Sequence, residues 1–121
     1  MGPASAGVAA VYAALQRPDV FQRAAAQSFY PVEPSHQRFE AMIAAADPQP
    51  ELIALVWSTR DYQLGEGVTA EATSKALAEQ LRAAGIPLRE QISTYSPGWG
   101  GWRGQDDDLL KALFPIAQGD D

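Results

Sequence analysis

The opening stretch of the chain constrains the fold most, because a turn of small residues runs directly into an alanine-rich segment. Residues 2–15 read Gly-Pro-Ala-Ser-Ala-Gly-Val-Ala-Ala-Val-Tyr-Ala-Ala-Leu. Alanine and leucine favour a helix over residues 5–16, and Pro18 prevents the helix from continuing. Glycine and alanine at its start allow the helix backbone to pack closely against a sheet. The stretch therefore predicts a tight turn into a helix that lies on a β-sheet.

The composition is that of an ordinary globular domain. The chain has 121 residues, of which 46% are hydrophobic and 20% are charged, so one small domain with a packed core is expected. A net charge of −6 argues against nucleic acid and anionic membrane surfaces as partners, because both would repel the chain. The absence of cysteine excludes disulfides, thiolate metal sites and cysteine nucleophiles.

We expect neither a signal peptide nor a membrane span in this sequence. Its first residues show no basic region followed by an apolar run, so we expect no signal peptide. No stretch of the sequence approaches the roughly 20 apolar residues of a membrane span. We therefore expect a soluble, cytoplasmic protein without a membrane partner.

Helical and strand-like segments alternate along the chain. Residues 52–57 are apolar throughout, as in a strand that is covered on both faces, whereas residues 88–94 alternate between apolar and polar, as in an edge strand. The expected elements, in order, are helix 5–16, strand 21–28, loop 28–35, helix 36–46, strand 52–57, a helix between Thr69 and Gly85, strand 88–94, loop 95–104 and helix 106–117.

The two later helices have predicted caps and buried faces. Thr69 should cap the first of them, and Gly85 should end it in a left-handed conformation. The three aspartates at 106–108 would complement the positive end of the final helix. The residues expected to face inward are Ala72, Ala76, Leu77, Leu81 and Ala84 in the first helix, and Leu109, Leu110, Leu113 and Phe114 in the second.

Alternating helices and strands with short connections predict an α/β fold with a parallel sheet and right-handed crossovers. About three strands are visible, and the first helix lacks the strand that should precede its turn. We therefore expect residues 1–121 to form one domain, equivalent to the carboxyl-terminal half of a larger doubly wound domain and truncated at its amino terminus.

A truncated sheet would leave an edge uncovered. The strand 52–57 or its neighbour would then expose unpaired backbone groups, and Val8, Val11 and Leu15 would not all be buried in a monomer. We expect a homodimer or a complex with an upstream fragment to cover that edge, or else a chain that is only marginally folded.

Several stretches follow one another in an order and spacing that are hard to produce by chance. Residues 2–21 resemble a nucleophile elbow, its helix and a following R-P-D-x-F, and residues 26–28, Ala-Gln-Ser, resemble an S-Q-S after the next strand. Residues 55–61 resemble a strand and turn that end in an acidic residue, and residues 73–85 resemble a helix that closes with L-x-x-x-G. Residues 97–104 resemble a G-G-H-D-x-x-x-W-R-G loop with its Trp-Arg-Gly intact. Together these stretches resemble the last part of the esterase-family α/β-hydrolases that include enterochelin (ferric siderophore) esterases.

The resemblance implies a serine triad, in which a serine attacks an ester, a histidine moves the proton and an acid orients the histidine. It places Ala4 at the position of the serine. Gly2 and Gly7 lie one residue too far apart for a G-x-S-x-G motif centred on Ser5. Ser5 is an off-register hydroxyl, for which a helix cap or a small packing residue is the competing interpretation.

The histidine of the triad has no counterpart. Its position falls on Pro97, or on Trp99 if a gap follows residue 98, and neither side chain transfers protons. The only histidine is His36, at the start of the second predicted helix. That region caps the active site in the family, but a solvent-facing residue in the first turn of a helix is the simpler interpretation.

The acid of the triad does have a counterpart. Asp61 follows the most apolar strand and matches the acidic position of the family. It is either the remnant of a catalytic acid or a loop carboxylate paired with Arg60 or Arg103.

Two tryptophans and an arginine are candidate ligand-binding residues. Trp99 and Trp102 lie among glycines and would stack on an aromatic catechol, and Arg103 would bind its anionic groups. The competing interpretation is that they cover the end of the sheet. Residues 106–108 resemble a metal-binding run, but consecutive helical side chains point in different directions, so we expect no metal site there.

Two functions of different classes follow. The first is an esterase-family relative whose ancestral reaction is the hydrolysis of a siderophore-like ester, without a cofactor, and which is inactive because the serine and histidine are missing. The second is a binding module in which the same pocket or the sheet edge holds a siderophore-like molecule or another chain.

Overall fold

The computed structural model describes residues 1–31, 35–63, 68–94 and 98–116, without the side chains of residues 35 and 36. Four strands and four helices alternate along these segments. They are β1 (Gly2–Pro3), α1 (Ala4–Gln16), β2 (Arg23–Gln27), α2 (Ser35–Ala45), β3 (Leu52–Ser58), α3 (Ala70–Ala83), β4 (Leu88–Ser93) and α4 (Trp99–Leu113).

The strands form one parallel sheet in the order β1-β2-β3-β4. The predicted α/β class with a parallel sheet is therefore confirmed, and β1 is added to the three strands visible in the sequence. Its two residues are too few to show a pattern, but Gly2 lies opposite Ala26 and Pro3 opposite Gln27. Because β3 is paired along both sides, it does not form the exposed edge; β1 and β4 are the outer strands.

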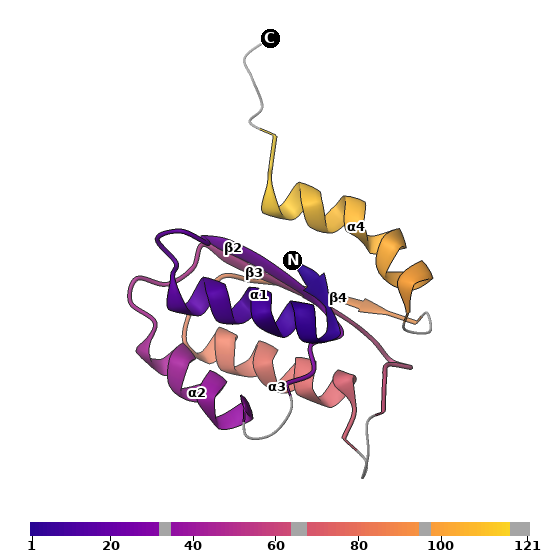
Figure 1. Ribbon diagram of the computed structural model, residues 1–121, viewed down its shortest axis with the longest axis horizontal. Helices are drawn as coiled ribbons and strands as arrows, with labels where there is room; N and C mark the ends of the chain where they lie inside the picture. The colour runs from indigo at the N-terminus through magenta and orange to yellow at the C-terminus, as the bar shows by residue number, and fades with distance from the viewer. Residues whose placement is uncertain (32–34, 64–67, 95–97, 117–121) are drawn as a thin grey trace.

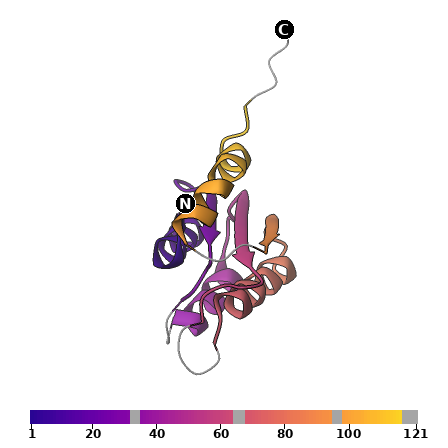
Figure 2. The same ribbon diagram turned by 90° about the vertical axis from the view of Figure 1, so that its right-hand side faces the viewer.

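Helices cover both faces of the sheet. Figures 1 and 2 show α1, α2 and α3 on one side and α4 on the other. Side chains of β3 alternate between the two layers: Ile53, Leu55 and Trp57 pack toward the three-helix layer, and Ala54 and Val56 pack toward α4. This arrangement explains why the β3 segment is apolar at every position. Among the described helices, none combines the length and hydrophobicity that a transmembrane segment needs.

The caps of α3 are those that the sequence predicts, and its buried face agrees with the prediction at Leu77 and Leu81 but not at Ala72 and Ala76. Thr69 accepts a hydrogen bond from the backbone N–H of Ala72, and Gly85 has a φ of 76°. Ala72 and Ala76 are exposed, so their predicted burial is wrong. Besides the predicted Leu77 and Leu81, the buried residues are Ala70, Thr73, Ser74 and Ala78. The sequence pattern missed Thr73 because it is polar; its hydroxyl is satisfied inside the interface by donating to the carbonyl of Phe29 at 2.6 Å.

Helix α4 begins at Trp99, seven residues before the predicted start at 106. The loop predicted for 95–104 is therefore wrong for residues 99–104, and residues 95–97 lie outside the described part. Residues 106–108 fall within the helix rather than at its positive end; Asp107 accepts a hydrogen bond from Lys111 Nζ at 2.7 Å, which raises the pKa of Lys111. Leu109 and Leu113 are buried as predicted, whereas Leu110 and Phe114 are 46% and 72% exposed.

Close backbone packing fixes the start of α1 against the sheet. A Cβ added to Gly7 would lie 2.6 Å from the carbonyl oxygen of Gly2 and 2.9 Å from the Cβ of Ala26. Farther along the helix, Val11 and Leu15 are buried and Val8 is partly buried. The sequence led us to expect that these three residues would not all be buried in a monomer, and Val8 is the one that is not fully buried. Only glycine permits this approach of α1 to β1 and β2.

We predict that Gly7→Ala lowers the free energy of unfolding by about 1–3 kcal/mol, because the added methyl group has no space. Urea denaturation followed by circular dichroism measures the change. Gly104→Ala is the matched control, because a Cβ at Gly104 meets nothing within 4 Å and alanine favours the helix. Equal stability of Gly7→Ala and the wild type would contradict the packing argument.

Candidate functional site

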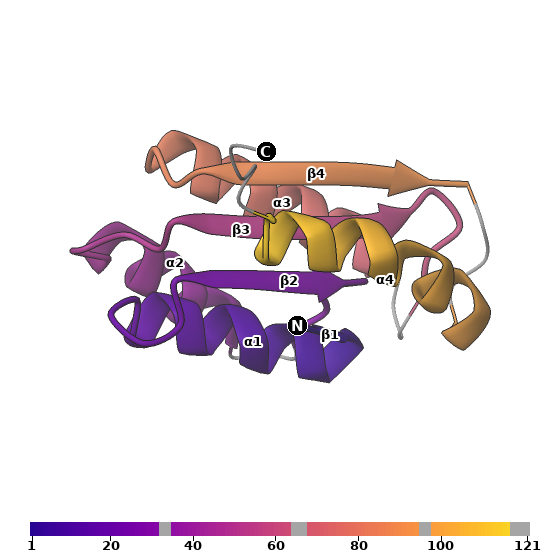
Figure 3. The ribbon, with the colours of Figure 1, turned by 90° about the horizontal axis from the view of Figure 1, so that it is seen from above.

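The candidate site lies where the chain leaves β1, β2 and β3. Ala4 follows β1, Ser28 follows β2 and Asp61 follows β3. The carboxyl ends of parallel strands meet at one edge of a sheet, and this edge is where open α/β sheets place their ligands. Figure 3 shows α4 crossing the sheet, with its first turns toward the arrowheads of β2 and β3. The amino-terminal half of α4 therefore borders the same edge.

The turn between β1 and α1 holds its central residue in a constrained backbone conformation. Ala4 has a φ of +47°, which an L-residue adopts only under constraint, at a cost of about 1–3 kcal/mol. A Cβ added to Gly2 would lie 2.6 Å from the Cβ of Ala6. The positions two before and two after Ala4 therefore approach so closely that both must be small, as in G-x-S-x-G. The residue at the centre of the turn carries a methyl group instead of a hydroxyl.

Ser5 lies one residue beyond this turn, in the first turn of α1, and it is exposed. The residue that caps α1 is Pro3, and no side chain caps the helix by a hydrogen bond. Ser5 is therefore neither a cap nor a buried packing residue. The hydroxyl of Ser5 therefore does not lie at Ala4, the residue with the constrained φ, where the resemblance would place a nucleophile.

Asp61 is the centre of a hydrogen-bonded cluster. Its Oδ2 accepts from the hydroxyl of Ser28 at 3.0 Å and from the backbone N–H of Ser58 at 3.0 Å. Its Oδ1 accepts from the backbone N–H of Tyr62 at 2.8 Å. Among the described residues, no arginine pairs with Asp61, so the expected pairing with an arginine is wrong. Neutral donors hold this carboxylate in place.

Ser28 connects Asp61 to α4. Its hydroxyl accepts a hydrogen bond from Trp102 Nε1 at 3.2 Å while it donates to Asp61. Ser28 is 3% exposed and has a φ of +55°. A serine in this constrained conformation directs its hydroxyl between the end of β3 and α4. The three side chains form a continuous chain of hydrogen bonds from Trp102 through Ser28 to Asp61.

Gln27 provides a second link between β2 and α4. Its Nε2 donates to the carbonyl oxygen of Trp102 at 2.9 Å and to Asp106 Oδ1 at 3.2 Å. Gln27 is 2% exposed, so this amide is a buried polar group with both of its N–H bonds used inside the protein. Gln27 and Ser28, which both bond to Trp102 of α4, stand at the end of one strand.

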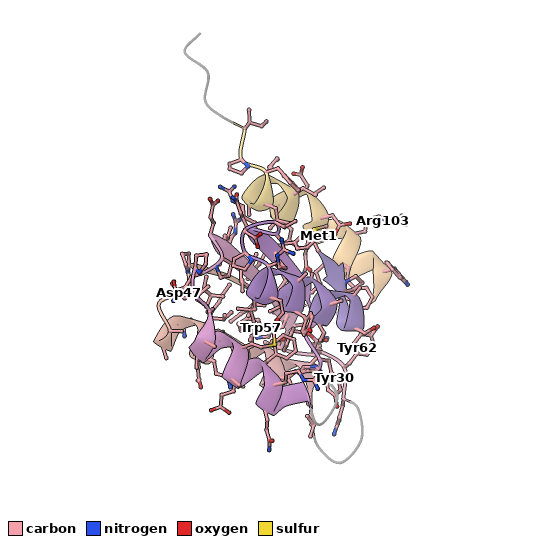
Figure 4. The ribbon with its side chains drawn as sticks, turned by 60° about the vertical axis from the view of Figure 1, so that its left-hand side comes forward. Met1, Tyr30, Asp47, Trp57, Tyr62 and Arg103 are labelled. Carbon is pink, nitrogen blue, oxygen red and sulfur yellow. The ribbon has the colours of Figure 1, made fainter. Side chains whose placement is uncertain are left out.

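The three predicted ligand residues share the first turns of α4 but have different surroundings. Trp102 is buried, with its ring 5.8 Å from that of Tyr62 and 5.5 Å from that of Trp99. Trp99 is 73% exposed. Arg103 is exposed on α4, whereas Trp57 lies in the interior (Figure 4). Trp102 thus covers the end of the sheet, and Trp99 and Arg103 remain open to solvent.

The glycines of α4 leave a pocket beside the end of β4. Its volume is about 670 Å³, within the range of small-molecule sites. Its lining residues are Gln91, Ile92, Ser93, Thr94, Gly100, Gly101, Gly104 and Gln105. In the part of the chain that the structure describes, no three histidine or carboxylate residues gather closely enough to hold a metal ion.

Two of the predicted positions cannot be placed in the site. Pro97 and the side chain of His36 lie outside the described residues. Three other participants were not predicted from the sequence: the hydroxyl of Ser28, the amide of Gln27 and the ring of Tyr62. For Ser28 and Gln27 the sequence offered one signal, the match of residues 26–28 to S-Q-S. That match locates the two residues at the end of a strand but does not say what their side chains bond to.

No protein-family model matches the chain, and comparisons with curated proteins and with solved structures also find no match. The resemblance to esterase-family hydrolases therefore remains an expectation from the sequence.

We predict that Ser28→Ala lowers the free energy of unfolding by about 1–3 kcal/mol, because it leaves the buried indole N–H of Trp102 without an acceptor. Ser5→Ala, at an exposed serine, should change stability by less than about 0.5 kcal/mol. Urea denaturation of both variants makes the comparison. In a Trp102→Phe background, Ser28→Ala should cost measurably less, because the two side chains are coupled; an undiminished cost would show that the hydrogen bond contributes nothing.

Proposed function

We propose that this protein is a non-hydrolytic relative of the esterase-family α/β-hydrolases. The observation that carries the proposal is the φ of +47° at Ala4, between a strand and a helix that approach each other through Gly2 and Gly7. This is the turn in which an α/β-hydrolase holds its nucleophile. Here the constrained residue has no atom that attacks a carbonyl.

The remaining triad positions support the same proposal. The chain has one histidine, His36, and the residues aligned with the catalytic histidine are Pro97 or Trp99. Asp61 stands at the acid position, but the hydroxyl of Ser28 and two backbone N–H groups are its hydrogen-bond donors. A carboxylate without a histidine to orient does not activate a nucleophile. The ancestral reaction, serine-dependent hydrolysis of a siderophore-like ester, is the one that this arrangement no longer supports.

We predict no serine-dependent turnover of activated esters above the buffer background, because Ala4 carries no nucleophile. The hydroxyl that does bond to a carboxylate, that of Ser28, is 3% exposed and also accepts from Trp102. The measurement is p-nitrophenyl ester hydrolysis together with fluorophosphonate labelling, read by mass spectrometry of the intact protein. Ser5→Ala is the matched control for the off-register hydroxyl. Labelling of the wild type that disappears in Ser5→Ala would overturn the proposal.

Binding of a small molecule is the second candidate function, and the exposed face of α4 favours it. Trp99 offers an open aromatic surface, and Arg103 one turn later has no ion-pair partner among the described residues. The glycine-lined pocket lies along the same helix. An aromatic group with an anionic substituent, such as a catechol of a siderophore, matches a tryptophan beside an arginine.

We predict that a dihydroxybenzoate quenches tryptophan fluorescence saturably, and that Arg103→Ala weakens this binding about tenfold by removing a charged donor. Trp99→Phe should remove most of the signal, because the other two tryptophans, Trp57 and Trp102, are buried. Arg89→Ala, on the exposed edge strand, is the control for a general charge effect. Equal affinities of the two arginine variants would contradict a site at Arg103.

A further inference from the structure

The amino-terminal half of α4, residues 99–104, is helical against its own sequence preference. Three of these six residues are glycine, and each glycine in a helix costs about 1 kcal/mol relative to alanine. The N-cap is Gly98, which provides no side-chain hydrogen bond, and the first turn contains no acidic residue. Nothing local to residues 99–104 therefore stabilises a helix.

The carboxyl-terminal half of α4 is held differently. Leu109 and Leu113 are 1% and 5% exposed and pack with Ala25, Ala54 and Val56 of the sheet. Lys111 and Asp107 form an ion pair one turn apart. Hydrophobic burial therefore secures this half without any contribution from residues 99–104.

A single docked side chain secures the glycine-rich half. Trp102 is the only residue of 99–104 that is buried, and its indole N–H bonds to Ser28 while its carbonyl accepts from Gln27. The ring also lies beside that of Tyr62. If Trp102 moves away from Tyr62, the segment loses its hydrogen bonds to Gln27 and Ser28 at the end of β2. It then retains three glycines and no contact that favours a helix.

We infer that residues 99–104 are a docking latch. The segment is helical while Trp102 is hydrogen-bonded to Ser28 and Gln27, and when these bonds break it unfolds locally while the rest of the domain stays folded. Local openings of this kind are drawn from regions with few buried contacts. In the docked state Trp102 donates to the Ser28 hydroxyl, which is buried and donates to the partly exposed Asp61. Opening exposes the Ser28 hydroxyl to a small hydrogen-bonding ligand. The latch itself does not depend on the proposed loss of hydrolysis.

Amide hydrogen exchange by NMR on the full chain tests the latch. The amides of residues 102–105 bond to carbonyls of the first turn, as Trp102 does to Gly98, whereas those of 108–111 belong to the second half. We expect 102–105 to exchange faster than 108–111 in the wild type. Trp102→Phe, which keeps a ring but lacks the N–H, should speed exchange at 102–105 about fivefold through loss of one hydrogen bond. Exchange at 108–111 should rise by no more than the loss of global stability that urea denaturation measures.

Two further variants keep the test decisive if Trp102→Phe does not fold. Ser28→Ala removes the same hydrogen bond from the other side and should have the same local effect. The double variant Gly100→Ala/Gly104→Ala, at positions where an added Cβ meets nothing within 4 Å, should slow exchange at 102–105 about fivefold for each glycine. Equal exchange along the whole of α4 in the wild type, or an opening free energy at 102–105 equal to the global free energy of unfolding, would show that α4 opens as one unit and would overturn the inference. Ester turnover is not part of this readout, so failure of the latch and failure of the proposed function are distinguishable.

Discussion

The close approach of α1 to the sheet is the constraint on which the rest of the structure depends. Gly7 brings the helix backbone to the carbonyl of Gly2 and to Ala26, so the chain must turn within one residue after β1. That turn places Ala4 at a φ of +47°. The β1–β2 pairing and the position of the candidate site at the end of the strands follow from the same contact.

A second constraint, the chain of hydrogen bonds from Trp102 through Ser28 to Asp61, joins the two layers of the molecule. It connects the ends of β2 and β3 with the helix on the opposite face. Buried polar groups of this kind are costly when one partner is removed, so the network defines one arrangement of α4. The same dependence on a few polar contacts makes the glycine-rich half of the helix separable from the half held by Leu109 and Leu113.

The end of the sheet combines a constrained turn with a buried polar network. Ala4, at a φ of +47°, carries only a methyl group, and the carboxylate of Asp61 accepts a hydrogen bond from Ser28. Under the proposed function, the site keeps the shape of a hydrolase but not its chemistry, because catalysis needs the nucleophile and the base as a unit. Trp99 is exposed on the same helix as the glycines that line the pocket beside β4.

The sequence by itself determined the α/β class, the strand at β3, the caps of α3 and the positions of Ala4 and Asp61, because periodicity, turn residues and motif spacing are local properties. Only the tertiary structure decided where β1 pairs, which face of α3 is buried and where α4 begins. Two residues show no strand pattern until Ala26 and Gln27 lie beside them. The sequence pattern of tryptophan among glycines is typical of a loop. The segment is helical because Trp102 bonds to Gln27 and Ser28, which lie more than 70 residues earlier in the chain. Contacts between residues so distant in sequence leave no local signal, and they override the weak helix preference of glycine.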